Sequence, residues 1–378
     1  MELWSGARRC ALGGALAVAM IGGGCALEPG EIGAVRAEAR GGIPGPPRRD
    51  AGPPPASSDA SSPAASTCCS QRTLGSLPRE LRHLAWPALP AIAGELHVST
   101  DAELAAALRE RTRTRIHVHG VHLGLYVLAR SDVELMLDAD AFIEHLLIAR
   151  SQHRVRVVGG TFAAIEMMPP VDYPNGGTEP EAALMATDVT IECVTVHATD
   201  TAFLVRGSRV AILGADVTAE RYALYAGDAA PLPIDDVIVA HSVLRAAGPE
   251  ATYRLQGVRR SVVASTTLSN PLKHNWRVHG DSELNYLGDS TLVGTGAMIG
   301  WIDGDSLERA WFVRNTVYYD ASSGLFLAEP TRVSRLVVTD NVVYSDEPFD
   351  PGAGPRWTVA RNVTSPYEPP PSSVFTCR

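Results

Sequence analysis

The sequence has few aromatic residues (6%) and few charged residues (20%), and its formal net charge is −9. An acidic chain lacks the basic surface that phosphate backbones bind, so we expect no nucleic-acid partner. No Cys or His spacing matches a zinc site. We predict neither a metal nor a cofactor.

The chain is instead rich in turn-forming residues, with 34 Gly and 27 Pro, and 45% of it is hydrophobic. Frequent turn formers and few aromatics favour many short strands joined by tight turns over a helical bundle. The composition therefore indicates an all-β protein with a substantial core.

Residues 1–24 have the form of a signal peptide. Two arginines precede a short apolar run that ends in Gly22-Gly23-Gly24-Cys25. Small residues before Cys resemble the lipobox of bacterial lipoproteins, where the Cys is acylated, although that family prefers Leu where this chain has Gly22. We expect an exported protein, either anchored to an outer membrane or cell surface through lipid on Cys25, or secreted after an ordinary signal cut.

Residues 25–85 are predicted to form a disordered tether, because their Pro, Ser, Ala and Gly content cannot bury enough apolar surface. An exported chain can hold disulfides, and pairing of Cys68 or Cys69 with Cys377 would tie its two tails together. Cys193 lies in an apolar strand pattern and is predicted to be a buried free thiol.

From Ser131 the chain repeats pairs of apolar residues at intervals of about 22–25 residues. A second short strand follows each pair, and a third ends in Gly. An insertion, Pro169 to Ala183, lengthens one interval. The pairs are Val133/Leu135, Val155/Val157, Val189/Ile191, Val210/Ile212, Val237/Val239, Leu284/Tyr286 and Leu336/Val338, with Val262 in the remaining interval.

Three short strands per repeat resemble one coil of the right-handed parallel β-helix (pectate-lyase-like) superfamily. The resemblance implies a single β-helix domain over residues 86–346. Thr100-Asp101-Ala102-Glu103 has the form of a capping box, which predicts an N-terminal helix that covers the open end of the core. Residues 347–378 are Pro-rich and are predicted to be a tail lying back on the surface.

The third strands contain the candidate site. Aligned by their terminal Gly, they place Leu255, Val278 and Ile302 in the core, while residues on either side face outward. The earlier rungs are expected to place Leu204, Leu224 and Ala226 outward, so the polarity is local. The outward residues form one row of Arg254, Arg277 and Trp301, and a second row of Arg206, Gln256, His279 and Asp303.

This combination suits a sugar polymer. Trp301 offers a flat apolar surface, and the arginines of both rows can bind a uronate carboxylate or a sulfate through paired hydrogen bonds. His279 is a candidate general base that Asp303 would orient, and Arg277 or Lys273 would neutralise the substrate carboxylate. A polysaccharide lyase or hydrolase is therefore one hypothesis. The other is a non-catalytic surface protein that binds glycan or a partner protein through the same residues.

Motifs of named enzyme families within this superfamily match only in fragments. Trp301-Ile302-Asp303-Gly304 is similar to the Trp-Ile-Asp-His element of pectate lyases, but Gly304 replaces the His and the Arg-x-Pro-x-x-Arg element is absent. Polygalacturonase motifs match only at His279-Gly280 and Asp235-Asp236, out of context. Asp235-Asp236 is predicted to be a turn. No specific family is identified, and we expect a monomer.

Two further groups are interpreted as structural. Asn315 and Asn341 occupy equivalent places in their repeats and predict an asparagine ladder at a turn. His117, His119 and His122 are spaced like metal ligands, but alternation in the strand separates His122 from the other two, so no metal is predicted there.

Overall fold

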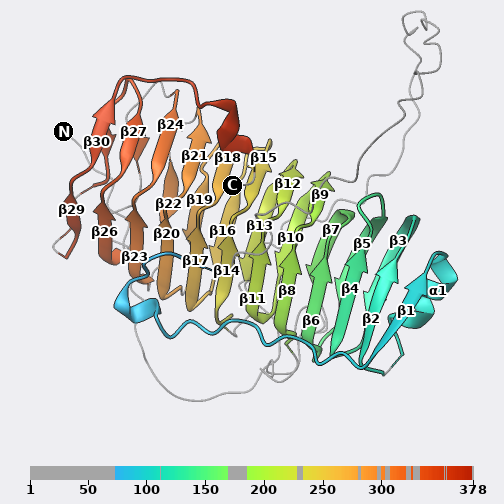
Figure 1. Cartoon of the computed structure of the whole chain (residues 1–378). Coiled ribbons are helices and arrows are strands. Elements are labelled where there is room, and N and C mark those ends of the chain that lie inside the picture. The colour runs from blue at the N-terminus through green and yellow to red at the C-terminus, as the bar shows by residue number, and fades with distance from the viewer. Residues whose placement is uncertain are drawn as a thin grey trace, which may run out of the picture. The chain divides into compact units, whose positions relative to one another are not determined.

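The computed structural model describes residues 73–110, 112–168, 185–227, 233–279, 282–295, 299–302, 307–320, 325–326, 333–352, 354 and 356–376. They form a parallel β-helix of about nine turns, with the strands stacked in sequence order (Figure 1). The predicted all-β fold class is confirmed. The predicted signal peptide, the acylated Cys25, the insertion and Asp303 lie outside the described residues.

One sheet of twelve parallel strands, sheet A, runs the full length of the β-helix. The predicted missing rung at Val262 is present as β17. The strands are β1 (Gly94–Val98), β2 (Thr114–Val118), β4 (Val133–Leu137), β6 (His153–Val158), β8 (Thr187–Glu192), β11 (Ser208–Leu213), β14 (Val237–Ala240), β17 (Arg260–Ala264), β20 (Leu284–Gly288), β23 (Leu307–Val313), β26 (Val333–Thr339) and β29 (Thr358–Ala360).

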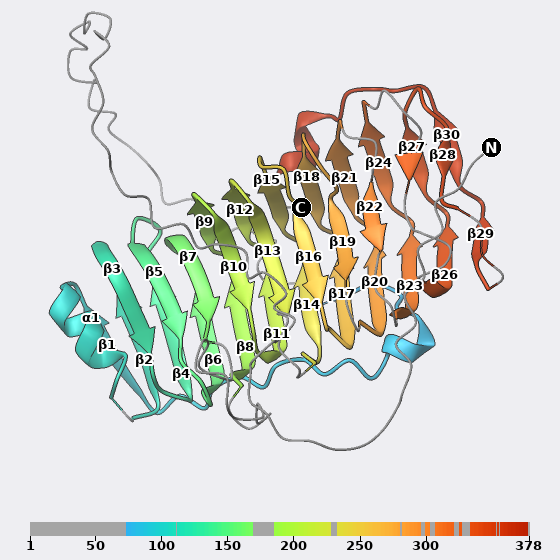
Figure 2. The ribbon, with the colours of Figure 1, turned by 180° about the vertical axis from the view of Figure 1, so that it is seen from behind.

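The opposing sheet, sheet B, begins as three long strands and then forks, as Figure 2 shows from behind. The long strands are β3 (Val121–Leu128), β5 (Phe142–Ile148) and β7 (Thr161–Met167). One branch contains β9 (Thr195–Ala198), β12 (Asp216–Ala219), β15 (Val243–Ala246), β18 (Thr267–Asn270), β21 (Thr291–Gly294), β24 (Thr316–Tyr319), β27 (Val342–Tyr344) and β30 (Val363–Ser365). The other contains β10 (Thr201–Val205), β13 (Tyr222–Gly227), β16 (Tyr253–Gln256), β19 (Trp276–His279) and β22 (Gly300–Ile302).

The fork explains why the repeat contains three strands only from β8 onward. At β7, Thr161 and Phe162 pair with β9, whereas Ile165 and Glu166 pair with β10. One long strand therefore faces two short ones joined by a corner. A separate two-stranded pair, β25 (Leu325–Phe326) and β28 (Phe349–Asp350), lies near the C-terminal end.

The N-terminal cap has the predicted form. Helix α1 (Asp101–Ala107) begins at a capping box, in which the Glu103 N–H donates to Thr100 Oγ1 and the Thr100 N–H donates to Glu103 Oε2. Leu104 and Leu108 are fully buried in the main core. A hydrogen bond also holds the C-terminal end of the helix, because Arg130 NH1 donates to the Ala107 carbonyl over 2.7 Å. The helix therefore closes the apolar column, as a terminal repeat must.

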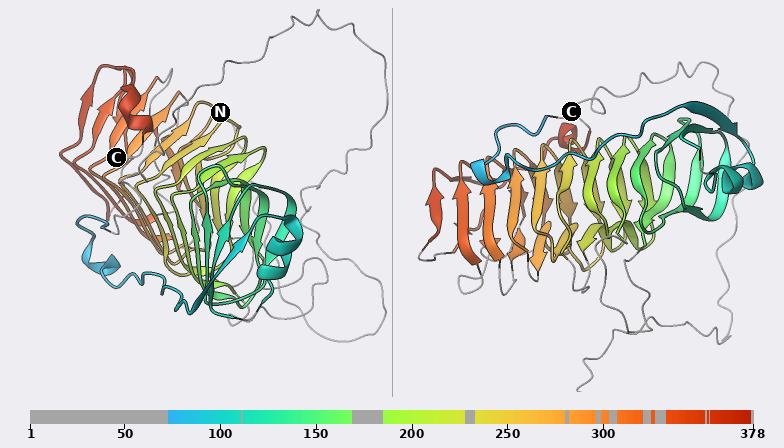
Figure 3. Two further views of the ribbon diagram at one scale, coloured as in Figure 1. Left: turned by 45° about the vertical axis from the view of Figure 1, so that its right-hand side comes forward. Right: turned by 90° about the horizontal axis from the view of Figure 1, so that it is seen from below.

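Residues 73–93, here called the strap, lie along the outer face of sheet A (Figure 3). The strap includes a short 3-10 turn, Arg79–Leu81. Leu74 and Leu81 are buried in a second apolar cluster there. The predicted tether boundary at residue 85 therefore needs correction, since residues 73–85 pack on the β-helix. Their leucines are widely spaced among polar and turn residues, so composition alone did not reveal the contact.

The outer face of sheet A changes character along its length. In the first rungs it carries a ladder of alternating charge, in which Arg115 contacts Glu95 at 2.8 Å and Glu134 at 2.6 Å. From β11 to β23 the outward side chains are apolar and are covered by the strap. A sheet buried on both faces reads as a continuous hydrophobic run, and all four residues of β14 are buried accordingly.

The turns at the ends of sheet A strands use left-handed backbone, which non-glycine residues seldom adopt. Asp188 and Arg209 occupy such positions on successive rungs, with φ of 56° and 54°. Arg209 Nε and NH2 each donate to Asp188 over 2.7 Å, and this contact, opposed by desolvation, lowers the pKa of Asp188. Paired hydrogen bonds of this kind offset the backbone cost. The same pairing recurs in Asp132–Arg154, Asp236–Arg260, Asp289–Arg314 and Asp340–Arg361.

Asp235-Asp236 lies at the predicted turn, where each carboxylate binds an arginine of the next rung. The predicted asparagine ladder is also confirmed. The Asn315 N–H donates to Asn341 Oδ1, and the Asn341 N–H donates to Asn362 Oδ1. Both groups hold neighbouring rungs together at turns.

The prediction for Cys193 was wrong. Cys193 is disulfide-bonded and not a free thiol. It follows β8 at a turn with φ of 58°, which takes it out of the apolar strand pattern. It is the only Cys among the described residues, so its partner lies outside them. The pairing predicted for Cys68, Cys69 and Cys377 also lies outside them.

The β-helix continues beyond residue 346, where the sequence placed its end. The strands β29 and β30 add another rung. The tail then lies back on the branch that contains β15 and β18, as expected. A 3-10 turn (Ser372–Phe375) buries Val374, and the Val374 carbonyl accepts a hydrogen bond from Thr267 Oγ1 over 2.6 Å.

Candidate functional site

The predicted rows of outward residues are present on the shorter branch of sheet B. Arg254 pairs with Arg277 across β16 and β19, and Arg277 pairs with Trp301 across β19 and β22. In the second row, Gln256 pairs with His279. Leu255, Val278 and Ile302 alternate with them and are fully buried, as expected.

The alignment by glycine placed the preceding strand, β13, one residue out of register. The predicted outward placement of Leu224 and Ala226 was therefore wrong. Both are fully buried, and Tyr225 faces outward between Leu204 and Arg254. Gly227 pairs with Gln256 and not with the glycine after it, and a one-residue slip exchanges the two faces of a strand. No side chain fits there, because a Cβ on Gly227 would lie 1.7 Å from the Gln256 carbonyl oxygen.

The face that results is larger and more aromatic than the sequence indicated. It consists of Tyr225, Arg254, Gln256, Arg277, His279 and Trp301, with the buried Tyr222 bonded to Arg254, and is here called the arginine–aromatic face. Tyr222 and Tyr225 were missed. A correct register at Gly227 is the signal that would have found Tyr225.

Arg254 is the most completely positioned cation of this face. Its NH1 donates to the Tyr222 hydroxyl over 2.7 Å and its NH2 donates to Gln256 Oε1 over 3.1 Å. The guanidinium also lies 4.8 Å from the centre of the Tyr225 ring. In the described part of the chain no carboxylate forms an ion pair with it, and Glu250 acts on it only weakly. Arg254 is therefore a fixed positive charge held by neutral partners.

The other predicted residues divide into those on this face and those beside it. Arg277 faces outward within 3.7 Å of Glu250, so its charge is partly balanced. The Trp301 ring lies 5.5 Å from that of His274, which the sequence analysis did not single out. Lys273 lies on the exposed turn before β19, where its N–H donates to Asn270 Oδ1.

Arg206 follows β10, two rungs before Gln256, as predicted. Its charge acts on Glu166, which lies in the row of Leu204, Tyr225 and Arg254. The row of Arg254 thus extends back to the fork of sheet B.

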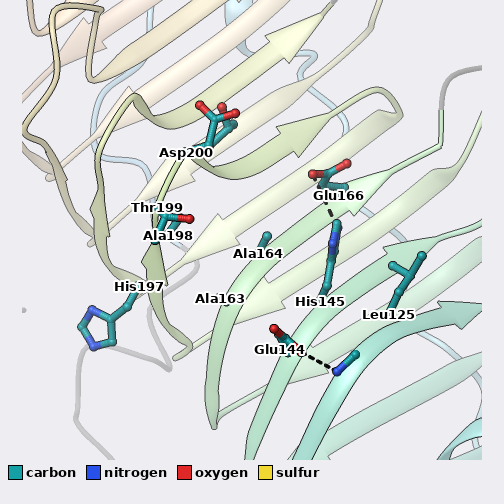
Figure 4. Close-up of a pocket in the computed structure, with 12 residues that line it drawn as sticks. Leu125, Glu144, His145, Ala163, Ala164, Glu166, His197, Ala198, Thr199 and Asp200 are labelled. Atoms are coloured by element: carbon teal, nitrogen blue, oxygen red, sulfur yellow. Dashed lines mark hydrogen bonds and ion pairs between the residues drawn. The ribbon is translucent and has the colours of Figure 1, made fainter. Parts of the chain in front are cut away.

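A pocket of about 460 Å³ lies at this fork (Figure 4). Its floor contains Ala163 and Ala164, which occupy the stretch of β7 between the residues that pair with β9 and those that pair with β10. On the side away from β5 the chain turns the corner at Thr199 and Asp200, so neither β9 nor β10 pairs with these alanines. The small side chains and the corner together leave the hollow.

The polar side chains of the fork pocket were not predicted. His145 Nε2 lies 3.4 Å from Glu166 Oε1 (Figure 4). The hydrogen bond with His145, together with the charge of Arg206, lowers the pKa of Glu166 despite its partial burial. Glu144 accepts the Gly124 N–H over 2.5 Å, and Asp200 lies 3.9 Å from Arg221. No sequence motif marks this set, because strand pairing at the fork brings it together.

The histidines near the cap contact one another and nearby carboxylates. His119 contacts His97 at 3.0 Å and Asp138 at 2.5 Å, while His122 is fully buried and bound to Asp101. Over the residues that the structure describes, no group of three or more His, Cys, Asp or Glu side chains is arranged to hold a metal ion. The same residues contain no helix of the length and hydrophobicity needed to cross a membrane.

Comparison with known proteins identified no relative: no family model, no curated protein and no solved structure matches this chain. The resemblance to parallel β-helix proteins is therefore one of fold. Function has to be inferred from the geometry of the site.

Proposed function

We propose that this protein is an exported β-helix protein that binds an acidic polysaccharide along the arginine–aromatic face. The observation that carries the proposal is Arg254, whose guanidinium is held by two neutral hydrogen-bond acceptors and a tyrosine ring. A positioned cation without an ion pair is suited to a carboxylate or sulfate of a ligand, because guanidinium binds such groups through paired hydrogen bonds.

The surroundings of Arg254 favour a sugar polymer over a small anion. Tyr225 and Trp301 supply flat apolar surfaces three rungs apart, and rungs spaced at about 4.8 Å place them about 14 Å from each other. Arg277 and Gln256 supply polar groups between them. A chain molecule that runs along the β-helix axis can contact all of these, with repeated rings on repeated rungs.

Export is proposed from the N-terminal sequence and from Cys193. The signal-peptide pattern of residues 1–24 precedes Cys25, which we propose is acylated and anchors the protein to an outer membrane or cell surface; ordinary secretion is the alternative. Disulfides persist outside the cytoplasm, and Cys193 is disulfide-bonded. The residues between Cys25 and the strap would then hold a monomeric β-helix away from the membrane.

Binding is expected to depend on Arg254. Replacing Arg254 by Ala should weaken affinity for a uronate polymer about 10–100-fold, since a charge-assisted hydrogen bond contributes roughly 1.5–3 kcal/mol. Affinity electrophoresis in gels that contain polygalacturonate, alginate or a sulfated glycan measures this. Arg254→Lys should recover only part of the affinity, because Lys lacks the planar pair of donors.

Arg335→Ala is the matched control, because it removes the same charge from an exposed position on β26. It should leave retardation unchanged. If Arg254→Ala and Arg335→Ala weaken retardation equally, binding depends on the net charge of the protein and not on the position of Arg254, and the proposed site is wrong. Trp301→Ala should weaken retardation of every polymer that binds.

A uronate lyase is the second candidate, because Arg277 and His279 project from the same side of β19. In such a reaction His279 removes the proton beside the carboxylate, the C–H electron pair forms a double bond, and the glycosidic oxygen departs and takes a proton from water. Arg277 or Lys273 would neutralise the carboxylate, and Asp303 would orient the base. If this reading is wrong, the face binds glycan or a partner protein without catalysis.

The lyase candidate predicts a rise in ultraviolet absorbance from the unsaturated product when the full chain is mixed with a polymer that it binds. The rise should vanish in His279→Ala and in Arg277→Ala, while retardation by the polymer persists in His279→Ala. Absorbance that does not change on any bound polymer would exclude a lyase for those substrates.

A further inference from the structure

The fork pocket is separate from the arginine–aromatic face but lies on the same surface. Glu166 pairs with Leu204, and the same row continues through Tyr225 to Arg254. A polymer bound along this row therefore reaches the pocket at its N-terminal end. The pocket also has depth, because Ala163, Ala164 and Ala198 leave room for a sugar ring.

His145 and Glu166 lie side by side in this pocket. Glu166 approaches Nε2 of the imidazole at 3.4 Å, and about a third of the His145 side chain remains exposed. The other ring nitrogen, Nδ1, makes no hydrogen bond to the described residues. A carboxylate beside one nitrogen orients the ring and leaves the other nitrogen free to exchange a proton with a ligand.

The other two carboxylates of the pocket, Glu144 and Asp200, differ in the contacts that they already make. Glu144 accepts the Gly124 N–H. Asp200 has only a long contact with Arg221, and its side chain is 67% exposed. Figure 4 shows Asp200 on the corner between β9 and β10, whereas Glu166 and His145 come from the neighbouring long strands. The pocket thus offers an imidazole paired with one carboxylate and a second carboxylate from another element.

We propose that the fork pocket is where the polysaccharide of the proposed function is hydrolysed; the inference rests on that function. His145, oriented by Glu166, acts as the general acid and gives a proton to the glycosidic oxygen as the carbon–oxygen bond breaks. A water molecule forms the new bond to the anomeric carbon and gives a proton to Asp200. The proton that Asp200 gains replaces, through solvent, the one that His145 lost. Nothing but water is consumed, and a new reducing end is produced.

The charges of the pocket also specify the sugar unit. Three carboxylates line it, and a uronate ring beside them would be repelled. Elimination would require that uronate to lie within the pocket, so hydrolysis fits better. The substrate class is therefore a mixed polysaccharide, with acidic units on Arg254 and Arg277 and a neutral or amino sugar at the bond that is cleaved.

The test measures new reducing ends from mixed acidic polysaccharides incubated with the full chain, and retardation of the chain by the same polymers. His145→Gln, Glu166→Gln and Asp200→Asn should each lower the rate of cleavage at least 100-fold while retardation is retained. His83→Gln, which removes an exposed imidazole from the strap, is the matched control and should cleave at the parent rate.

Two results would overturn the inference while leaving the proposed function intact. One is a polymer that retards the parent chain but yields no reducing ends. The other is cleavage that persists in both His145→Gln and Glu166→Gln. If no polymer retards the parent chain, the proposed function itself has failed. Products that absorb in the ultraviolet would assign cleavage to elimination at His279 instead.

Discussion

A chain that starts at residue 86 is expected to unfold at a lower temperature than a chain that starts at residue 73, and to self-associate. The first lacks Leu74 and Leu81, which are buried against the outer face of sheet A. Burial of each leucine contributes about 1.5–3 kcal/mol, so the pair contributes roughly 3–6 kcal/mol. Both chains lack Cys68 and Cys69, so any disulfide to that region is absent from each.

Loss of the strap also uncovers apolar side chains. Ile238, Val262, Tyr286 and Trp311 face outward beneath it on neighbouring strands. A contiguous apolar patch on a sheet is a site of aggregation when exposed. Thermal unfolding followed by circular dichroism, with size-exclusion chromatography, measures both effects.

A point variant separates burial from chain length. Leu81→Asp should reproduce most of the loss in the full chain, since an unpaired carboxylate would enter a fully buried site. His83→Ala lies in the same segment but is exposed, and should have little effect. Equal stability of the two shortened chains would show that the strap does not hold sheet A.

Asn341→Leu is expected to lower the free energy of unfolding by about 3–5 kcal/mol, because two or more buried polar groups lose their partners at roughly 1–3 kcal/mol each. The Asn341 side chain is fully buried and accepts from the Asn315 N–H, while its Nδ2 donates to the Phe312 carbonyl and to Asn362 Oδ1. Leucine has a similar volume, so the change tests hydrogen bonding more than packing.

The ladder is longer than the two asparagines that predicted it. Ser242, Thr266 and Ser290 occupy the same turn position on earlier rungs, and each accepts a backbone N–H from the rung before. Asn362→Leu, at the half-buried end of the ladder, should cost less than Asn341→Leu because water can replace its partners. Equal losses for the two variants, measured by denaturant unfolding, would argue against this dependence on burial.

The repeat was readable from the sequence because each coil has to place apolar residues inward at fixed intervals. Val262 and the capping box at Thr100 were located correctly for this reason: one follows from the period and the other from local hydrogen bonding. The rows of Arg254, Arg277 and Trp301 were also correct. Inward and outward residues alternate within each of these strands, and this local pattern was enough to place the three side chains on the outer face.

The errors came from contacts between segments far apart in the sequence. The strap buries Leu81 against strands more than a hundred residues later, and no local pattern encodes that partner. Tyr225 was missed because Gly227 pairs with Gln256, one residue before the glycine to which the sequence aligned it. Cys193 was misread because its turn interrupts an otherwise apolar strand pattern.

The sequence by itself determined the all-β repeat, the capping helix and the outward arginines, because these depend on periodicity and local capping. Only the tertiary structure decided where sheet B forks, and hence that His145, Glu166 and Asp200 surround one pocket. These residues come from β5, from β7 and from the corner after β9, which the pairing of strands brings together. Strand pairing depends on the three-dimensional path of the chain, which a one-dimensional repeat does not specify.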